Sequence, residues 1–225
     1  MAHDQVTISC SSETVAALVR DGSALVVLSA VQTHNRSGVP LVWYRTKAFS
    51  NFTELTWSPT YAAYASLNGA STSSPIKLGQ RFEVAAGPVG TVENNGIPGA
   101  ILLHNRSQAQ YSCGISQSAP GGTLNRVCAF PFCGGNVQTI VPLPWIVLLF
   151  TTVAVTVGEP LPPEMEVSFV DQVATGTTGP ALSLNLSAQP VVAVQYDVNT
   201  GWSWFSSVEG ASVIDPSQIV PTLIQ

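Results

Sequence analysis

Residues that could carry catalysis are few in this chain of 225 residues. A serine or cysteine nucleophile needs a histidine base within hydrogen-bond reach, and the histidines are His3, His34 and His104. The chain contains no Gly-x-Ser-x-Gly turn and no lysine-bearing phosphate loop. We therefore predict that the protein is not an enzyme and has no catalytic residues. One alternative stays open, in which His34 or His104 titrates beside Cys113 or Cys133.

Carboxylates and cysteines predict no metal or cofactor site either. Glu164 and Glu166 form a close pair that a glycosidase could use, but beside prolines such a pair is more typical of a solvated strand edge. The four cysteines are Cys10, Cys113, Cys128 and Cys133. The spacing of Cys128 and Cys133 occurs in zinc sites, but no second close pair accompanies it. The sequence favours free buried thiols and leaves a disulfide open as the alternative.

The charge distribution argues against nucleic acid as a partner. Only 9% of the residues are charged, against roughly 25% in an average soluble protein. All eight basic residues lie between Arg20 and Arg126, so residues 127–225 carry seven acidic residues and no basic one. Affinity for nucleic acid comes mainly from Lys and Arg contacts to phosphates, and the densest basic pair here is Arg45 with Lys47.

The sequence also predicts no membrane span. The longest apolar run, residues 145–157, has 13 residues, whereas a membrane helix needs about 20. Eight of the 13 are β-branched, and Pro142, Pro144 and Gly158 bracket the run. This pattern is typical of a buried strand. Residues 1–5 lack the basic and apolar regions of a secretory signal, so we expect none in this sequence.

Strand-like segments separated by turn signals run along the chain. The pattern predicts strands or apolar strand-like stretches at residues 25–31, 41–44, 52–57, 81–85, 100–104, 166–170, 181–186 and 191–198. Residues 66–75 and 119–136 are predicted loop regions, and Asn68-Gly69 is a strong turn dipeptide. One short helix is expected at residues 14–20, with Ser12 as its N-cap. The turn spacing predicts an all-β fold, either an antiparallel β-sandwich or a β-barrel, with long loops and at most short helices.

We expect residues 1–225 to form a single β-rich domain. The richest proline stretch, residues 159–163, is the candidate for a division. Its flanks are both strand-like, so a proline-containing loop within one domain explains it better than a linker does.

Aromatic and hydroxyl-rich segments are the candidates for recognition. In a strand, Trp202 and Trp204 would share one face, with Phe205 opposite. Exposed, the two rings could stack on sugars or anchor an interface; the alternative is that they fill a core face. The small uncharged residues of the loops either form solvated turns or serve as adaptable contacts to a partner. The candidate recognition residues are Trp202, Trp204, Thr175, Thr177, Thr178, Asn68 and Ser71.

The overall composition carries a resemblance to a known class. Short strands, poor in Lys and rich in Thr, Ser, Gly and Pro, are seen in LFTTVAVTVGEPLPPEMEVSF and DQVATGTTGPALSLNLS. In this the chain resembles the protruding or spike domains of small non-enveloped RNA virus capsids, among which astrovirus spikes are similar in length. The resemblance implies a homodimeric projection on the virion surface, assembled in the host cytoplasm, that attaches to a host receptor protein or glycan and is recognised by antibodies.

Our function hypothesis is therefore a non-catalytic recognition domain of this kind. The alternative is a soluble β-sandwich lectin, or a related defence or toxin protein, that binds glycans through Trp202 and Trp204. We expect a homodimer because a chain that is 45% hydrophobic has little charge with which to cover its surface.

Overall fold

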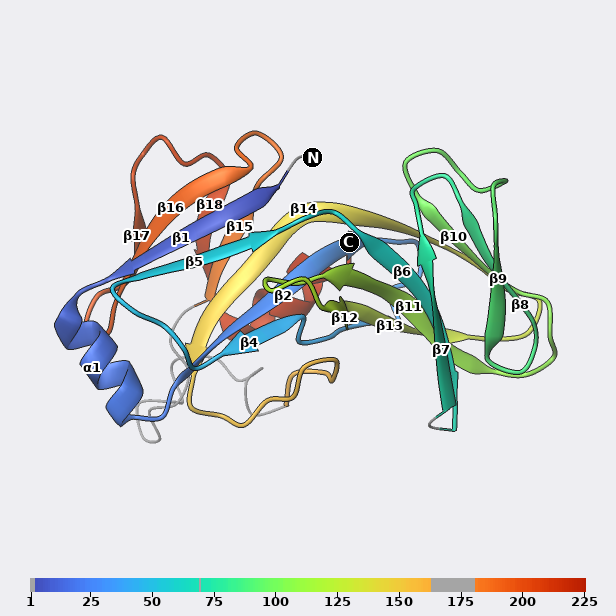
Figure 1. Ribbon diagram of the computed structural model, residues 1–225, viewed down its shortest axis with the longest axis horizontal. Helices are drawn as coiled ribbons and strands as arrows, with labels where there is room; N and C mark the ends of the chain where they lie inside the picture. Colours follow the sequence, from blue (N-terminus) through green and yellow to red (C-terminus); the bar gives the residue numbers. More distant parts are fainter. Residues whose placement is uncertain (1–2, 69, 163–180) are drawn as a thin grey trace.

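The strands of the protein form three sheets in a computed structural model that describes residues 3–68, 70–162 and 181–225 (Figure 1). The four-stranded sheet has the order β17 (Gly201–Trp204), β16 (Val191–Asp197), β1 (Asp4–Cys10), β5 (Phe52–Trp57). In it β1 pairs in parallel with β16, with Gln5 opposite Val191, and antiparallel with β5, with Asp4 opposite Trp57.

The other two sheets are larger. The eight-stranded sheet has the path β18 (Ala211–Ile214), β15 (Ala181–Asn185), β14 (Val137–Thr151), β10 (Ile101–Asn105), β8 (Arg81–Ala86), β9 (Val89–Glu93), with β2 (Ala24–Gln32) paired to β14 and to β4 (Tyr44–Thr46). The six-stranded sheet has the path β3 (Val39–Pro40), β13 (Cys128–Phe132), β11 (Tyr111–Ser118), β6 (Tyr61–Leu67), β7 (Ala70–Ile76), with β12 (Leu124–Arg126) paired to β11. The helical elements are α1 (Ser12–Arg20), η3 (Pro216–Gln218) and α2 (Ile219–Leu223).

The all-β prediction is confirmed, with mostly antiparallel pairs packed as a sandwich. Within the described residues the sheets stay open and close no barrel. The main core draws side chains from all three sheets, such as Ile8 of the first, Leu148 of the second and Ile115 of the third.

The central strand pair of the molecule is β2 with β14. In Figure 1, β14 runs across most of the length of the molecule, from β10 to β15. Leu148 and Phe150 of β14 face the main core, while Val147 and Leu149 face a second core that includes Leu223 of α2. Because both faces are covered, residues 146–150 are apolar without alternation. The predicted buried strand is therefore confirmed up to Thr151, where β14 ends.

Three local predictions are corrected by the structure. The N-cap of α1 is Ser11, not Ser12, and its side chain accepts a hydrogen bond from the Thr14 backbone N–H at 3.0 Å. Residues 119–136 contain the strands β12 and β13 rather than only loop. In the predicted strand at residues 41–44, only Tyr44 belongs to a strand, β4. The predicted strand at residues 166–170 lies outside the described residues.

The predicted loop at residues 66–75 is also wrong, because β6 and β7 form a hairpin there. Leu67 pairs with Ala70, so the hairpin turn has two residues and begins at Asn68. Asn68 has a φ of 49°, the left-handed conformation that such turns need. Most of β7 is exposed or half-buried, and among the described strands it pairs only with β6. An edge strand of this kind tolerates small polar residues and Pro75, which is why its composition resembles a loop.

The proline stretch proposed as a possible division begins against the core. Val42 donates its backbone N–H to the carbonyl oxygen of Glu159 at 2.9 Å, and Leu161 is buried in the second core. The single-domain assignment for residues 1–225 stays a prediction.

Candidate functional site: a polar and aromatic cleft

The two tryptophans proposed for recognition lie on one face of β17, and that face points inward. Trp202 is 6% exposed and stacks on Phe150, with ring centroids 5.6 Å apart and planes 20° apart. It also packs against Tyr196, its partner across β16 and β17. Trp204 is half-buried against the same core, whereas Phe205 is 66% exposed. Trp202 therefore serves packing and offers little surface to a ligand.

Of the five small polar candidates, two lie in the β6–β7 hairpin and three lie outside the described residues. Asn68 is at the exposed turn of the β6–β7 hairpin, and Ser71 is exposed at the start of β7. The Ser71 Oγ accepts a hydrogen bond from Arg126 Nη2 at 2.6 Å. The remaining candidates, which all lie outside the described residues, are Thr175, Thr177 and Thr178. The structure thus brings none of the described candidates together in a pocket.

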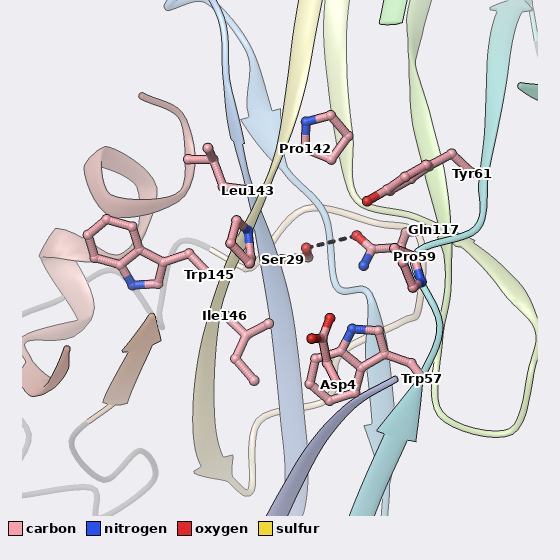
Figure 2. Close-up of a pocket in the computed structure, with 11 residues that line it drawn as sticks. Asp4, Ser29, Trp57, Pro59, Tyr61, Gln117, Pro142, Leu143, Trp145 and Ile146 are labelled. Carbon is pink, nitrogen blue, oxygen red and sulfur yellow. Dashed lines mark hydrogen bonds between the residues drawn. The ribbon is translucent and has the colours of Figure 1, made fainter. Parts of the chain in front are cut away.

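A different set of residues forms a cleft where the three sheets meet (Figure 2). Its volume is about 210 Å³. The lining residues are Asp4, Ser29, Trp57, Pro59, Tyr61, Gln117, Pro142, Leu143, Pro144, Trp145 and Ile146. Pockets for drug-sized ligands have roughly 300–1,000 Å³, so this cleft has room for a single ring-sized group of a larger ligand.

Ser29 fixes the amide of Gln117 at the back of the cleft. Both are buried polar residues, 2% and 5% exposed, and Ser29 Oγ donates to Gln117 Oε1 at 3.1 Å. This bond occupies the amide oxygen, and the amide nitrogen faces the cleft (Figure 2). Within the described residues no hydrogen-bond acceptor is paired with that nitrogen. This nitrogen is not one of the fully buried atoms without a partner, so it is open to the cleft and can donate to a ligand oxygen there.

Trp57 places a second N–H donor beside Gln117. Its indole is 4% exposed and has no hydrogen-bond acceptor among the residues that the structure describes. Figure 2 shows the indole nitrogen directed to the same space as the Gln117 amide. Because the ring is so deeply buried, it offers a ligand its N–H edge rather than a stacking face.

Trp43 supports both donors from inside the core. This residue is fully buried, and its ring packs edge-on against Trp57 with centroids 5.2 Å apart and planes at 83°. Its Nε1 donates to the backbone oxygen of Gln117 at 3.1 Å, and its own backbone oxygen accepts from Asn125 Nδ2 at 2.9 Å. Trp43 is therefore a positioning residue for the cleft, held between β12 and β5.

Asp4 and Tyr61 complete the polar lining at the mouth. The carboxylate of Asp4 and the hydroxyl of Tyr61 point toward the Gln117 amide (Figure 2). Burial raises the pKa of Asp4 above its ordinary value, with a smaller opposing effect of His3. Burial, and then the charge of Asp4, raise the pKa of Tyr61 to about 12, so the phenol stays neutral and can both donate and accept. In its ionised form Asp4 accepts hydrogen bonds and donates none.

An irregularity in β14 opens the remaining wall. The pairing of β14 with β2 shifts register between Pro142 and Ile146, where β14 has extra residues relative to β2. Proline has no N–H to donate to a ladder, so Pro142 and Pro144 suit such a break. Trp145 points away from the cleft space (Figure 2), and its indole N–H bonds to Ser183 Oγ on β15.

A cluster of charged residues on β8, β9 and β10 has a different character. Glu83 is 7% exposed, and its carboxylate lies 3.1 Å from Arg81, 3.1 Å from Arg106 and 3.3 Å from His104 Nδ1. The hydrogen bond from Arg106 is the largest of the effects that lower the pKa of Glu83, so the Glu83 carboxylate stays ionised. His104 is engaged with Glu83, while Cys113 lies fully buried in the core. These charges compensate one another, as in a structural ion-pair network.

All four cysteines are free thiols, so the disulfide alternative is wrong, and the predicted burial is confirmed for three of them but wrong for Cys133. Cys10, Cys113 and Cys128 are buried, whereas Cys133 is exposed. Burial raises the pKa of the Cys128 thiol to about 12. In the described ranges no group of three or more His, Cys, Asp or Glu residues is arranged to hold a metal ion.

Comparison with known proteins gives no match of any kind: no family model, no curated protein and no solved structure matches this chain. Among the described residues, no helix is long and apolar enough to cross a membrane.

No sequence signal pointed to this cleft in advance. Its lining comes from the strands β1, β2, β5, β6, β11 and β14, which only the sheet topology brings together. Two parts of the lining are local in sequence, namely residues 57–61 around the turn at Ser58-Pro59 and residues 142–146 of β14.

Proposed function

We propose that the protein is a non-catalytic recognition domain that binds one sugar ring of a glycan in the cleft described above. The observation that carries this proposal is the convergence of the Gln117 and Trp57 N–H donors, which have no acceptor among the described residues, with the Asp4 carboxylate. A sugar ring presents several hydroxyls, each able to donate and accept. Fixed donors and a carboxylate around a ring-sized cleft are complementary to such a ligand.

In its biological setting we propose that this domain is a viral capsid projection that attaches to a host receptor and carries antibody epitopes. The composition of the chain and its sparse charge support this setting. A soluble lectin or defence protein would use the same cleft without the viral setting, and it stands as the alternative.

A homodimer is expected from the sparse charge of the chain, and it is also what the capsid projection implies. The expected result is a solution mass of about twice the 23.6 kDa of the chain, measured by light scattering at micromolar concentration. Several exposed apolar side chains, among them Phe52, Val191 and Phe205, are available to such an interface. A monomeric mass with glycan binding retained would favour the lectin alternative.

The cleft itself is tested by replacing Gln117 with alanine and measuring binding on a glycan array. We expect Gln117→Ala to weaken every glycan that the unaltered protein binds by about tenfold or more, because one buried hydrogen bond to the sugar is lost (about 1.4 kcal/mol is tenfold). The matched control is Gln195→Ala on β16, which removes the same side chain from an exposed position outside the cleft. Equal losses in both variants, or no binding by the unaltered protein to any glycan, would contradict the proposal.

A further inference from the structure

The cleft carries negative charge and no positive charge. Asp4 is the one acidic residue among the 11 that line it, and none of them is Lys, Arg or His. The basic residues elsewhere are held in other contacts or lie outside the lining, such as Arg81 and Arg106 with Glu83 and Arg126 with Ser71. His3, which precedes Asp4 in the chain, is the group whose charge partly offsets that of Asp4.

The position of Asp4 in the sheet places its negative charge beside the expected ligand. Asp4 lies opposite Trp57 in the pairing of β1 with β5, so its carboxylate is beside the indole edge that offers the N–H. Its partial burial, which raises its pKa, also weakens the screening of its charge by water. A second carboxylate brought into the same cleft would be repelled at close range, whereas a hydroxyl would donate to Asp4.

We propose that the cleft selects an uncharged terminal sugar and rejects acidic sugars, with Asp4 as the residue that determines this specificity. This inference rests on the proposed glycan-binding function and names its ligand class. Asp4 accepts hydrogen bonds from sugar hydroxyls, while the Gln117 amide and the Trp57 indole donate to the oxygens of the same ring. A uronic or sialic acid would place its carboxylate in a cleft that holds no cation to receive it.

The first arm of the test compares sugars that differ only at one carbon. Methyl glucoside and methyl galactoside are measured against the methyl glycosides of glucuronic and galacturonic acid. Methyl mannoside, N-acetylglucosamine and sialic acid serve as further probes. Binding to the purified protein is followed by NMR titration near neutral pH and at low ionic strength. We expect each neutral sugar that binds to do so at least about tenfold more tightly than its acidic counterpart.

The second arm removes the charge of Asp4 while keeping its shape. In Asp4→Asn we expect the preference for neutral over acidic sugars to fall to within about threefold, because the repulsion is gone and an amide can donate to a carboxylate. Glu54→Gln is the matched control, since it removes one carboxylate from an exposed position on the neighbouring strand β5, outside the cleft. This control should keep the full preference.

The outcomes separate the two proposals. Preferential binding of an acidic sugar by the unaltered protein would overturn the selectivity while leaving glycan binding intact. An unchanged preference in Asp4→Asn would overturn the role of Asp4. Failure to bind any sugar, neutral or acidic, would overturn the proposed function itself.

Discussion

Replacing Trp43 with alanine is expected to lower the free energy of unfolding by about 3–5 kcal/mol, the range for removing a large buried aromatic ring. Trp43 is fully buried and packs edge-on against Trp57. Its removal leaves a cavity and also leaves the Gln117 backbone oxygen without the indole N–H that it accepts. The measurement is urea denaturation followed by circular dichroism, with the slope checked for two-state behaviour.

Two further variants make this result specific. Phe205→Ala truncates an aromatic residue that is 66% exposed, so it should cost about 0.5 kcal/mol or less. Trp43→Phe keeps most of the ring but removes the N–H, and we expect it to be less destabilising than alanine while still weakening sugar binding. If Trp43→Ala cost no more than Phe205→Ala, the packing described for the core behind the cleft would be wrong.

Gly114→Ala is expected to be comparably severe, with a loss of about 3 kcal/mol or more, at the upper end of what overpacking costs. A Cβ atom at Gly114 would lie 2.1 Å from the backbone oxygen of Cys128, a position that only a shift of the main chain could relieve. That oxygen is already held by the Tyr64 hydroxyl at 2.7 Å, and Tyr64 pairs with Gly114 across β6 and β11. The glycine thus allows three strands to approach closely.

Thermal and urea denaturation of Gly114→Ala against Ser112→Ala test this expectation. Ser112 is an exposed residue of the same strand, so its replacement by alanine should change the stability by about 0.5 kcal/mol or less. Failure of Gly114→Ala to accumulate as folded protein would agree with the clash. A loss below about 1 kcal/mol would mean that β13 can move aside, contrary to the tight contact.

Strands with one covered face were predictable from sequence because their burial alternates. In β5 the residues Thr53, Leu55 and Trp57 point inward and their neighbours point outward, which is the period-two pattern that sequence reveals directly. The central part of β14 was predictable for the opposite reason, since a continuous apolar run indicates two covered faces.

Other elements were not predictable because their sequences fit more than one environment. The polar β7 is a strand on account of its hairpin turn and its partner β6 rather than its own side chains. For Trp202, the i and i+2 spacing with Trp204 correctly indicated a shared face. Whether that face was the core or the surface depended on Phe150, which is distant in sequence.

The cleft was the least predictable part of the molecule. Asp4, Ser29 and Gln117 are unremarkable in sequence, and they meet only because β1, β2 and β11 come together in the folded chain. Chemistry that depends on such a meeting leaves no local spacing to detect. This contrasts with compact motifs, in which the reacting residues lie within one turn or one loop.

The parallel pairing of β1 with β16 has a consequence for the order in which the protein can be assembled. Gln5 and Val191 are neighbours in the sheet although nearly the whole described chain separates them. Contacts of such long range slow folding, and during synthesis at the ribosome β1 must wait for β16 to emerge. Until then β1 can pair only with β5, and its other edge is free to recruit a strand from a second nascent chain. Production at low temperature or slow expression would favour the correct intramolecular closure.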